Sequence, residues 1–474
     1  MIIEGQRVQA ASGETYDVMN PATGEVVDSV PAGGAEDVDR AARAAAKAQA
    51  SWGRLAPAER AKILHKAAAH AHSKVEEIAP ILTREQGKTL LESKIEAERF
   101  ADNIAWFADL ADKVHGEHVN LASTKLTGLV VRRPIGVTGA IVPWNFPLTL
   151  AANKVAPSIA AGNCVVLKPS STTPLSTLAC IQALLDGGLP EGVINVVVGT
   201  ETGDAIVTHP LIRKIGLTGS TPTGKKVMAR AADQLKKITL ELGGSDPCIV
   251  LDDADLAAAA AGVRVGRFFN CGQACLATKR IYVQEGVYDQ FLELIVAQAG
   301  KMKPGNGMDP ASRMGPMHTE KQRTEVEAQV KDAMDKGARL VYGGGRPQGE
   351  GFDKGSFLNP VVLADVPHDS RMVTEEVFGP ALPVIKVKDL DEAIRRANDS
   401  PFGLGSSIWT GSMASAFRAI NELEAGYTWV NSVQIAYDEL PFGGTKQSGF
   451  GKEHGVEAFH EYTEMKSVVI GGLG

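Results

Sequence analysis

Between residues 137 and 241 the sequence alternates short apolar runs with segments of helical periodicity. We predict strands at 137–142, 163–167, 194–198, 214–218 and 237–240, and helices at 174–186, 202–209 and 222–232. Apolar strands that alternate with amphipathic helices are typical of a parallel sheet covered on both faces. Because such sheets bind ligands at the carboxyl ends of their strands, we expect the functional site there.

A second alternating set begins after the aspartates at 252–255, which predict the start of a helix, and continues to Trp429. The sequence therefore predicts an α/β protein with two doubly wound, Rossmann-like domains. We assign 1–120 and 141–249 to a cofactor-binding domain and 250–440 to a catalytic domain. The remaining stretches, 121–140 and 455–474, contain strand-like patterns and are expected to form a small β element for oligomerisation, paired with each other or with another subunit.

Composition narrows the class of function. The 474 residues carry a formal charge of -7, which leaves no basic surface for nucleic acid. The N-terminus lacks a signal-peptide pattern, and no uninterrupted apolar stretch is long enough for a membrane span. Five cysteines are too few for a disulfide framework in a chain of this length. We expect a cytoplasmic protein with no membrane or nucleic-acid partner.

One thiol stands out by its position. Cys275 follows the turn residues Gly272 and Gln273, and a cysteine in a turn can face a pocket as a nucleophile. A small buried hydrophobe is the commoner role of a cysteine. Cys271 lies four residues earlier, but no histidine or second cysteine pair stands at ligand spacing, so we predict no metal site.

Two further candidates lie at strand ends. Glu241 follows the strand predicted at 237–240, so its carboxylate is expected to face the ligand crevice, where it could act as a general base. Asn145 lies between Pro143 and Pro147, which fix the backbone, so its amide could donate to an oxyanion. The alternatives are a capping or surface glutamate and an ordinary asparagine in a turn.

The segment 217–226, which contains Gly219 and Ser220, resembles the phosphate-binding loop of nucleoside triphosphatases. Lys226 stands where that loop has its hydroxyl residue, which disfavours a kinase or ATPase because the magnesium ligand is missing. Small residues before a helix N-terminus also suit the pyrophosphate of a dinucleotide. A cation and a hydroxyl, Lys168 and Ser171, follow another strand, so a ribose 2′-phosphate should be tolerated there.

Taken in order, five motifs resemble those of the NAD(P)-dependent aldehyde dehydrogenase superfamily, non-acylating type. They are Pro143-Trp-Asn-Phe-Pro, Glu241-Leu-Gly-Gly, Asn270-x-Gly-Gln-x-Cys275, Glu375-Glu-Val-Phe-Gly-Pro and Pro441-Phe-Gly-Gly. The resemblance covers essentially the whole chain, and it implies that NADP or NAD is the cofactor. It also implies a homodimer or homotetramer joined through the 120–140 hairpin and the C-terminal strand.

The resemblance implies a role for each candidate residue. Cys275 would attack the aldehyde carbon, the Asn145 side chain and the Cys275 backbone N–H would hold the oxyanion, and Glu241 would activate water to hydrolyse the thioester. The residues implied in cofactor binding are Pro143, Trp144, Lys168, Ser171, Gly219, Ser220, Glu376 and Phe378. The presence of Glu241 disfavours the coenzyme A-acylating branch of the family, which lacks this base, and the full catalytic set disfavours a non-catalytic binding protein.

The sequence says less about the aldehyde. Resemblance to succinate semialdehyde dehydrogenases implies two arginines and a serine for a substrate carboxylate, but Asn153, Phe269 and Ala436 stand at those positions. Because no cation pairs with an acidic tail there, we predict a neutral aldehyde, hydroxylated, aliphatic or aromatic. The residues predicted to contact it are Phe146, Asn153, Phe269, Tyr437 and Phe442. A succinate-semialdehyde-type enzyme is the alternative.

Overall fold

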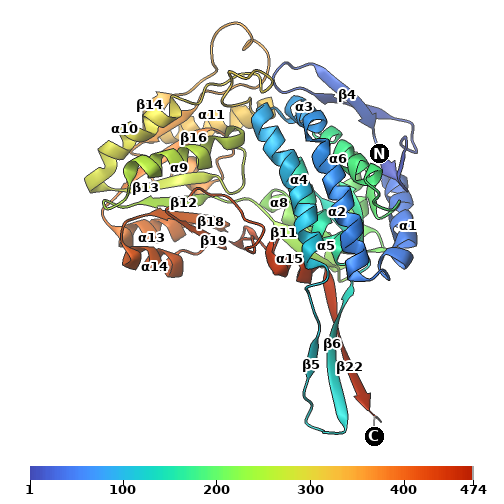
Figure 1. The fold of residues 1–474 in the computed structure, drawn as a ribbon. Helices are drawn as coiled ribbons and strands as arrows, with labels where there is room; N and C mark the ends of the chain where they lie inside the picture. The colour runs from blue at the N-terminus through green and yellow to red at the C-terminus, as the bar shows by residue number, and fades with distance from the viewer. Residues whose placement is uncertain (472–474) are drawn as a thin grey trace.

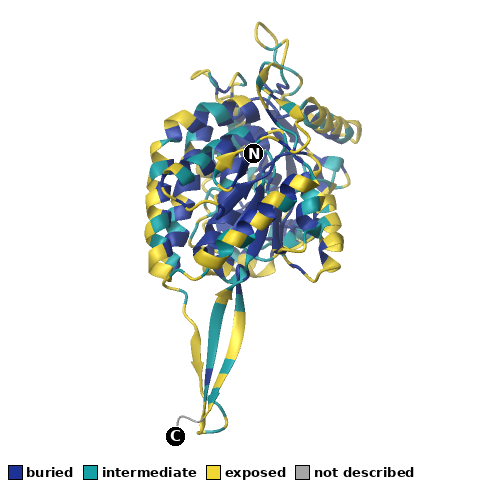
Figure 2. Cartoon of the chain, turned by 90° about the vertical axis from the view of Figure 1, so that its right-hand side faces the viewer, coloured by how far each residue is buried: buried dark blue, intermediate teal, exposed yellow. Residues whose placement is uncertain are grey.

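Two β-sheets flanked by helices form two lobes in the computed structural model, which describes residues 1–471 (Figure 1). Buried residues concentrate in the strands and on the inward faces of the helices, as Figure 2 shows. The mixed α/β class that the sequence predicts is confirmed. Among the described residues, no helix has both the length and the apolar character needed to cross a membrane.

The first sheet has the strand order β2-β1-β9-β8-β7-β10-β11-β21. Its strands are β1 (Ile2–Ile3), β2 (Gln6–Arg7), β7 (Val137–Ile141), β8 (Cys164–Lys168), β9 (Ile194–Val196), β10 (Ile212–Thr218), β11 (Lys237–Glu241) and β21 (Gly449–Phe450). Strands β9, β8, β7, β10 and β11 run parallel, as the alternating pattern predicts. The helices that connect these strands or pack on them are α1 (Ala35–Trp52), α5 (Pro147–Ala160), α6 (Leu175–Asp186), α7 (Thr202–Thr208) and α8 (Thr221–Ala232).

The second sheet has the order β14-β15-β16-β13-β12-β18-β19. Its strands are β12 (Asp246–Val250), β13 (Thr278–Gln284), β14 (Arg339–Gly343), β15 (Val361–Ala364), β16 (Ala381–Val387), β18 (Gly405–Trp409) and β19 (Tyr427–Val430). The helices of this lobe are α9 (Leu256–Phe268), α10 (Tyr288–Ala299), α11 (Glu320–Asp335), α12 (Arg371–Thr374), α13 (Leu390–Asn398) and α14 (Met413–Glu422). Strand β12 joins this sheet, although the predicted domain boundary after residue 249 places most of it in the first domain. A short buried strand carries no local signal for the sheet that it will join.

A three-stranded sheet projects from the first lobe in Figure 1, in the order β22-β6-β5. It consists of β5 (Glu117–Val119), β6 (Leu126–Pro134) and β22 (Thr463–Gly471), with β22 antiparallel to β6 along its whole length. The predicted pairing of the C-terminal strand with the 120–135 region is therefore confirmed. The segment before β22 is not a strand but the short helix α15 (Gly455–Glu461), which buries Ala458 and Phe459. Residues 472–474 of the predicted segment lie outside the described residues.

Three helices cover the first lobe beside the N-terminal hairpin of β3 (Thr15–Met19) and β4 (Val26–Pro31). They are α2 (Pro57–Ser73), α3 (Val75–Gln86) and α4 (Leu90–Leu110), and α4 packs against α5. Helix α4 begins at a capping box, in which the Thr89 side chain accepts from the Glu92 backbone N–H and the Glu92 carboxylate accepts from the Thr89 N–H. This start of α4 lies close to the site described below.

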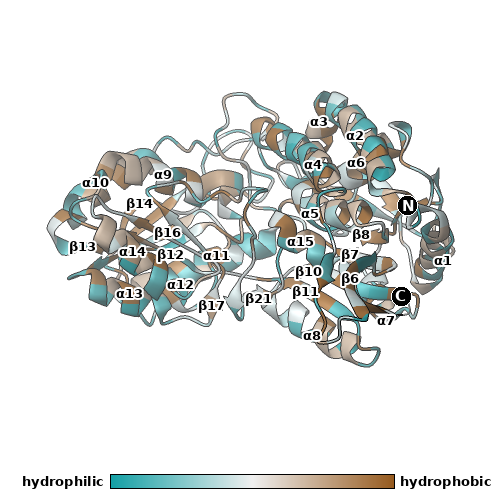
Figure 3. Ribbon diagram, turned by 60° about the horizontal axis from the view of Figure 1, so that its bottom comes forward, coloured by the Kyte–Doolittle hydropathy of each residue, from teal (hydrophilic) through white to brown (hydrophobic). Residues whose placement is uncertain are grey.

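The C-terminal part of the chain crosses between the lobes. Strand β17 (Phe402–Gly403) pairs with β20 (Thr445–Lys446), and β21 then joins the edge of the first sheet beside β11. In Figure 3, β17 and β21 lie near the place where the two lobes meet, and α15 lies close by on the first lobe. The second lobe is therefore tied to the strand that carries Glu241.

Candidate active site

The candidate residues gather where the parallel strands of the first sheet end. Strands β7, β8, β10 and β11 run in the same direction, so their carboxyl ends lie at one edge. Lys168 and Glu241 are the last residues of β8 and β11, Gly219 follows β10, and Asn145 lies in the loop after β7. The turn that leads to Cys275 comes from the second lobe and meets this edge.

A strained turn follows α9 and leads to Cys275. Asn270, Cys271 and Gly272 have φ angles of 50°, 56° and 72°, all in the left-handed region, which costs a residue with a side chain about 1–2 kcal/mol. A Cβ atom on Gly272 would lie 2.4 Å from the carbonyl oxygen of Gly379, so only glycine fits there. Such strain persists where the surroundings hold it in place, and it is typical of functional sites.

The Cys275 thiol is half-buried. Burial raises its pKa to about 12, and the nearby cation of Lys279 opposes this shift only partly. Lys279 is itself engaged, because its Nζ donates to the Cys275 carbonyl oxygen at 2.5 Å and to Glu376 at 2.8 Å. In the protein without ligands the nucleophile is therefore a neutral thiol, and it must lose its proton as it attacks.

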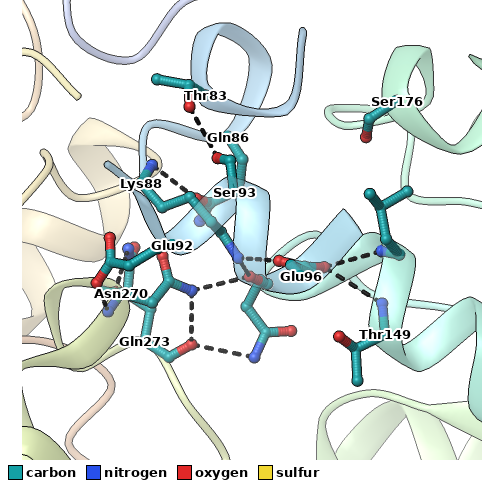
Figure 4. A network of polar contacts seen from close by, with 12 residues as sticks. Thr83, Gln86, Lys88, Glu92, Ser93, Glu96, Thr149, Ser176, Asn270 and Gln273 are labelled. Carbon is teal, nitrogen blue, oxygen red and sulfur yellow. Dashed lines mark hydrogen bonds and ion pairs between the residues drawn. The ribbon is translucent and has the colours of Figure 1, made fainter. Parts of the chain in front are cut away.

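The Asn145 side chain is buried beside the Cys275 turn. Its Nδ2 donates to the carbonyl oxygen of Gln273 at 3.1 Å, and the Asn145 carbonyl oxygen accepts from Asn270 Nδ2 at 2.8 Å. An amide nitrogen has two hydrogens, so the bond to Gln273 leaves one free to donate to a ligand. These bonds join the loop after β7 to the turn that leads to Cys275, whose residues Asn270 and Gln273 are labelled in Figure 4.

Glu241 is a buried carboxylate whose oxygens accept no hydrogen bond of good geometry from a described residue, although the nearby Gly444 backbone N–H partly opposes the rise of its pKa. Burial raises its pKa well above the ordinary value, and the negative charge of Glu453 adds to the shift. The backbone that follows Glu241 passes close to Cys275: a Cβ atom on Gly244 would lie 3.0 Å from the Cys275 carbonyl oxygen. A desolvated carboxylate with an elevated pKa near a thiol is suited to take a proton from water.

Gly219 and Ser220 form the start of α8. The Ser220 side chain caps the helix by accepting from the Thr223 N–H, and a Cβ atom on Gly219 would meet nothing closer than the Leu217 side chain at 3.8 Å. The backbone here is open to a ligand at the positive end of a helix. This arrangement fits a phosphate or pyrophosphate group.

Lys168 and Ser171 lie on the neighbouring loop after β8. Lys168 is half-buried, and burial lowers its pKa. Its Nζ donates to the Pro169 carbonyl oxygen at 3.3 Å, and no carboxylate of a described residue contributes to its pKa shift. A desolvated cation without a carboxylate partner fits an anionic group such as a ribose phosphate, and the half-buried Ser171 adds a hydroxyl.

Glu376 and Phe378 both lie against Lys279, which also binds the Cys275 carbonyl oxygen, and Trp144 packs on Phe378. Glu376 Oε1 accepts from Lys279 Nζ at 2.8 Å and from the Gly244 N–H at 3.1 Å, which leaves Oε2 available. The Phe378 ring packs edge-on against Trp144, with ring centroids 5.7 Å apart. Pro143 precedes Trp144 and is half-buried.

His318 joins this group, and the sequence analysis missed it. Its ring stacks on Trp144 with centroids 4.5 Å apart, and its Nε2 and Nδ1 contact the Thr172 hydroxyl and the Gln86 carbonyl oxygen. Burial lowers its pKa to about 4, so the ring is neutral near pH 7. A single histidine before a helix has no local pattern that marks such a role.

Three of the predicted substrate residues are phenylalanines that lie in or against the loops of Asn145 and Cys275. The rings of Phe146 and Phe269 lie parallel, with centroids 6.0 Å apart. Phe442 packs in an apolar cluster with Trp429 and Leu404, and Cys275 lies against this cluster. An apolar surface therefore adjoins the thiol.

The two polar substrate candidates differ in exposure. Asn153 is buried, and its Nδ2 contacts Glu453 at 3.0 Å and His454 at 3.1 Å, while its Oδ1 has no partner. Tyr437 is 46% exposed, so it lies at the surface rather than in a closed pocket. The structure does not bring these two side chains into direct contact.

A cation that the sequence analysis missed lies beside this region. Arg99 of α4 donates to Asp438 at 3.1 Å and to the carbonyl oxygen of Ala436 at 3.5 Å. His454 and Asn103 also contact the same Asp438 oxygen. Because Asp438 balances its charge, Arg99 is not a free cation, and residues this far apart in sequence give no local sign of the contact.

Comparison with known proteins identifies related chains. A model of the Aldehyde dehydrogenase family matches residues 8–468. The 3-sulfolactaldehyde dehydrogenase of Pseudomonas putida is 41% identical over 99% of this chain and 96% of its own length. Among solved structures, an NADP-dependent enzyme of E. coli is 39% identical, with a TM-score of 0.97 over 99% of this chain and 98% of that one. The betaine aldehyde dehydrogenase of Staphylococcus aureus, solved with NAD+, is 36% identical, with a TM-score of 0.95 over 99% and 94%.

Proposed function

The chain belongs to the aldehyde dehydrogenase family and is an enzyme that oxidises aldehydes, and we propose that it does so through a covalent thioester on Cys275. The observation that carries this proposal is the buried, unpartnered carboxylate of Glu241 beside a half-buried thiol. A desolvated carboxylate without a partner is costly, so its presence at this site argues for a chemical role.

The first half of the reaction builds the thioester. The Cys275 sulfur adds to the aldehyde carbon, the thiol proton passes to solvent water, and the carbonyl oxygen becomes an oxyanion. The free N–H of the Asn145 amide and the Cys275 backbone N–H stabilise that charge. NAD(P), when bound, would supply the hydride acceptor, so that loss of hydride from the adduct carbon leaves a thioester.

The second half restores the thiol. Glu241 removes a proton from water as the water oxygen attacks the thioester carbonyl carbon. The C–S bond then breaks to release the carboxylic acid, and the proton on Glu241 passes to the Cys275 sulfur. The elevated pKa of Glu241 makes it a stronger base than an exposed carboxylate. Asn145 stabilises the oxyanion in this step also.

We propose that the cofactor is NADP or NAD, held by the residues named above. Gly219 and Ser220 at the start of α8 would hold the pyrophosphate, and Lys168 with Ser171 would face the adenosine ribose. The free oxygen of Glu376 would accept from the other ribose, beside Phe378. Because Lys168 has no acidic partner among the described residues, a 2′-phosphate should be accepted there.

We propose a neutral aldehyde as the preferred substrate, and a semialdehyde with an acidic tail as the alternative. The rings of Phe146, Phe269 and Phe442 give an apolar surface near Cys275. Arg99 is paired with Asp438, so it offers no unbalanced charge to an acidic tail. The relatives named above act on different aldehydes, so their names do not decide the question.

We propose a homodimer or homotetramer in the cytoplasm. The projecting sheet of β5, β6 and β22 exposes apolar side chains, among them Met465 and Val469. All five cysteines are unpaired, as expected for a reducing compartment.

The test is a comparison of initial rates with NAD and NADP over a panel of neutral and acidic aldehydes, monitored by absorbance of the reduced cofactor. We expect turnover with both cofactors and higher kcat/KM for the neutral aldehydes. A Cys275→Ala variant should produce no reduced cofactor, and full activity in that variant would contradict the mechanism. Complete rejection of NADP would contradict the role of Lys168 and Ser171.

A further inference from the structure

Three charged side chains at the start of α4 reach both loops of the active site (Figure 4). Lys88, Glu92 and Glu96 are buried, and we refer to them as the α4 brace. Lys88 precedes the helix, Glu92 lies in its first turn and Glu96 in its second. No step of the reaction described above uses them.

Lys88 binds the loop that carries Asn145. Its Nζ donates to the Asn145 carbonyl oxygen at 2.8 Å and forms an ion pair with Glu96. The same ammonium group lies 4.0 Å from the centre of the Phe146 ring. The contacts to the Asn145 carbonyl oxygen and the Phe146 ring therefore hold the backbone that carries the Asn145 side chain, while Glu96 balances the charge of Lys88.

Glu96 binds the other end of the same loop. Its Oε1 accepts from the backbone N–H groups of Leu148 and Thr149, at 2.9 and 3.3 Å. These N–H groups belong to the first turn of α5, where they have no partner within the helix. The Lys88–Glu96 pair therefore holds both sides of Asn145.

Glu92 binds the strained turn of residues 270–272 that leads to Cys275. Its Oε1 accepts from the Asn270 N–H at 2.7 Å, while its Oε2 closes the capping box at Thr89. Asn270 is the first of the three left-handed residues, so this bond stabilises the strained turn that leads to Cys275. Asn270 Nδ2 in turn donates to the Asn145 carbonyl oxygen, which Lys88 also contacts.

We propose that Lys88, Glu92 and Glu96 are positioning residues that hold the Asn145 amide and the Cys275 turn in the relative placement that the reaction requires. A buried ion pair contributes little net stability compared with apolar packing, so stability alone does not account for it. The contacts of the α4 brace end on the two catalytic loops. Stabilisation of an oxyanion depends on donors that are already in place, which is what such contacts supply. This inference rests on the proposed roles of Asn145 and Cys275.

The experiment is a double-mutant cycle with Lys88→Met and Asn145→Ala. Asn145→Ala removes the donor but retains the carbonyl oxygen that Lys88 contacts. If Lys88 acts through the Asn145 amide, Lys88→Met should lower kcat by about tenfold to a hundredfold in the wild-type background and by less than about threefold in the Asn145→Ala background. The KM for the aldehyde should change little in either case.

Two further variants separate positioning from folding. Lys88→Met with Glu96→Gln removes both charges together, and it tests the proposal if the single variant fails to fold. Lys214→Met is the matched control, because Lys214 is also a buried lysine and it contacts Thr239 and Glu461 instead of the catalytic loops. We expect the paired variant to fold and lose kcat, and the control to retain kcat.

The outcomes are distinct. Equal losses from Lys88→Met in both backgrounds, or wild-type kcat in the paired variant, would overturn the positioning role. If Asn145→Ala itself had wild-type kcat, the proposed function of Asn145 would fail instead. Thermal unfolding and cofactor binding, measured by fluorescence, establish that each variant is folded.

Discussion

At the scale of single residues, the environment of Glu241 predicts which half of the reaction it serves. Glu241→Gln preserves the size of the side chain but removes the base, so hydrolysis should slow by about 10²–10⁴-fold while the first oxidation continues. Stopped-flow absorbance should show a burst of one reduced cofactor per site, and intact mass should show an acyl adduct. A steady-state kcat within twofold of wild type would contradict the role.

The rate of thioester hydrolysis should depend on pH, with a direction set by the titration of Glu241. Burial raises the pKa of Glu241, and the base acts only when it is deprotonated. The hydrolysis rate should therefore rise with pH across a range above the ordinary titration of a glutamate. In the Glu241→Gln variant this rise should be absent, and an unchanged profile there would assign the titration to another group.

Cys275 should react slowly with alkylating agents in the free enzyme. Burial raises its pKa to about 12, so the thiolate fraction should grow about tenfold per pH unit between pH 7 and pH 10. Iodoacetamide inactivation rates should follow this slope, with Cys275→Ser as the control that assigns the modified thiol. A plateau near neutral pH would show that the thiol is already ionised.

His318 is predicted to serve the cofactor side of the site. His318→Leu removes the contacts to Thr172 and Gln86 and the imidazole ring that stacks on Trp144. The KM for the cofactor should rise by about tenfold, which corresponds to the loss of about 1.4 kcal/mol. The KM for the aldehyde should change less, and the reverse pattern in initial-rate kinetics would contradict this assignment.

At the scale of elements, the turn between α9 and Cys275 depends on Gly272. Gly272→Ala would place a Cβ atom 2.4 Å from the Gly379 carbonyl oxygen at a φ of 72°, so the turn must shift. We expect a loss of about 1–3 kcal/mol in the free energy of unfolding and a lower kcat. Gly286→Ala is the control, because a Cβ atom there meets nothing within 4 Å. Denaturant unfolding measures both, and equal effects would remove the special role of Gly272.

At the scale of the whole molecule, the projecting sheet predicts an oligomer. Met465 and Val469 on β22 are 69% and 61% exposed, and β22 is an unpaired edge in this chain. Substitution of both by lysine should convert a dimer or tetramer into a smaller species, measured by light scattering after size exclusion. Met413→Lys, at an equally exposed site on α14, is the control. A wild-type monomer would contradict the prediction.

Local patterns in the sequence determined most of the elements. The period of apolar residues predicted the five strands and three of the four helices from 137 to 241, but it did not predict α5. Asp255 was found where the N-terminus of α9 was predicted. These features depend on neighbours within a few residues, which is why the sequence alone reveals them. Cys275, Glu241 and Asn145 could also be selected in advance, because each lies in a motif bounded by glycine or proline.

Tertiary structure decided how these pieces meet. The place of β12 in the second sheet, the pairing of Arg99 with Asp438 and the contact of Glu92 with the Asn270 N–H join segments that are distant in the chain. The spacing of apolar residues indicates which face of a helix or strand is buried, but it does not indicate which other element covers that face. The placement of the catalytic loops therefore depends on the order of strands and the packing of α4, which only the folded chain specifies.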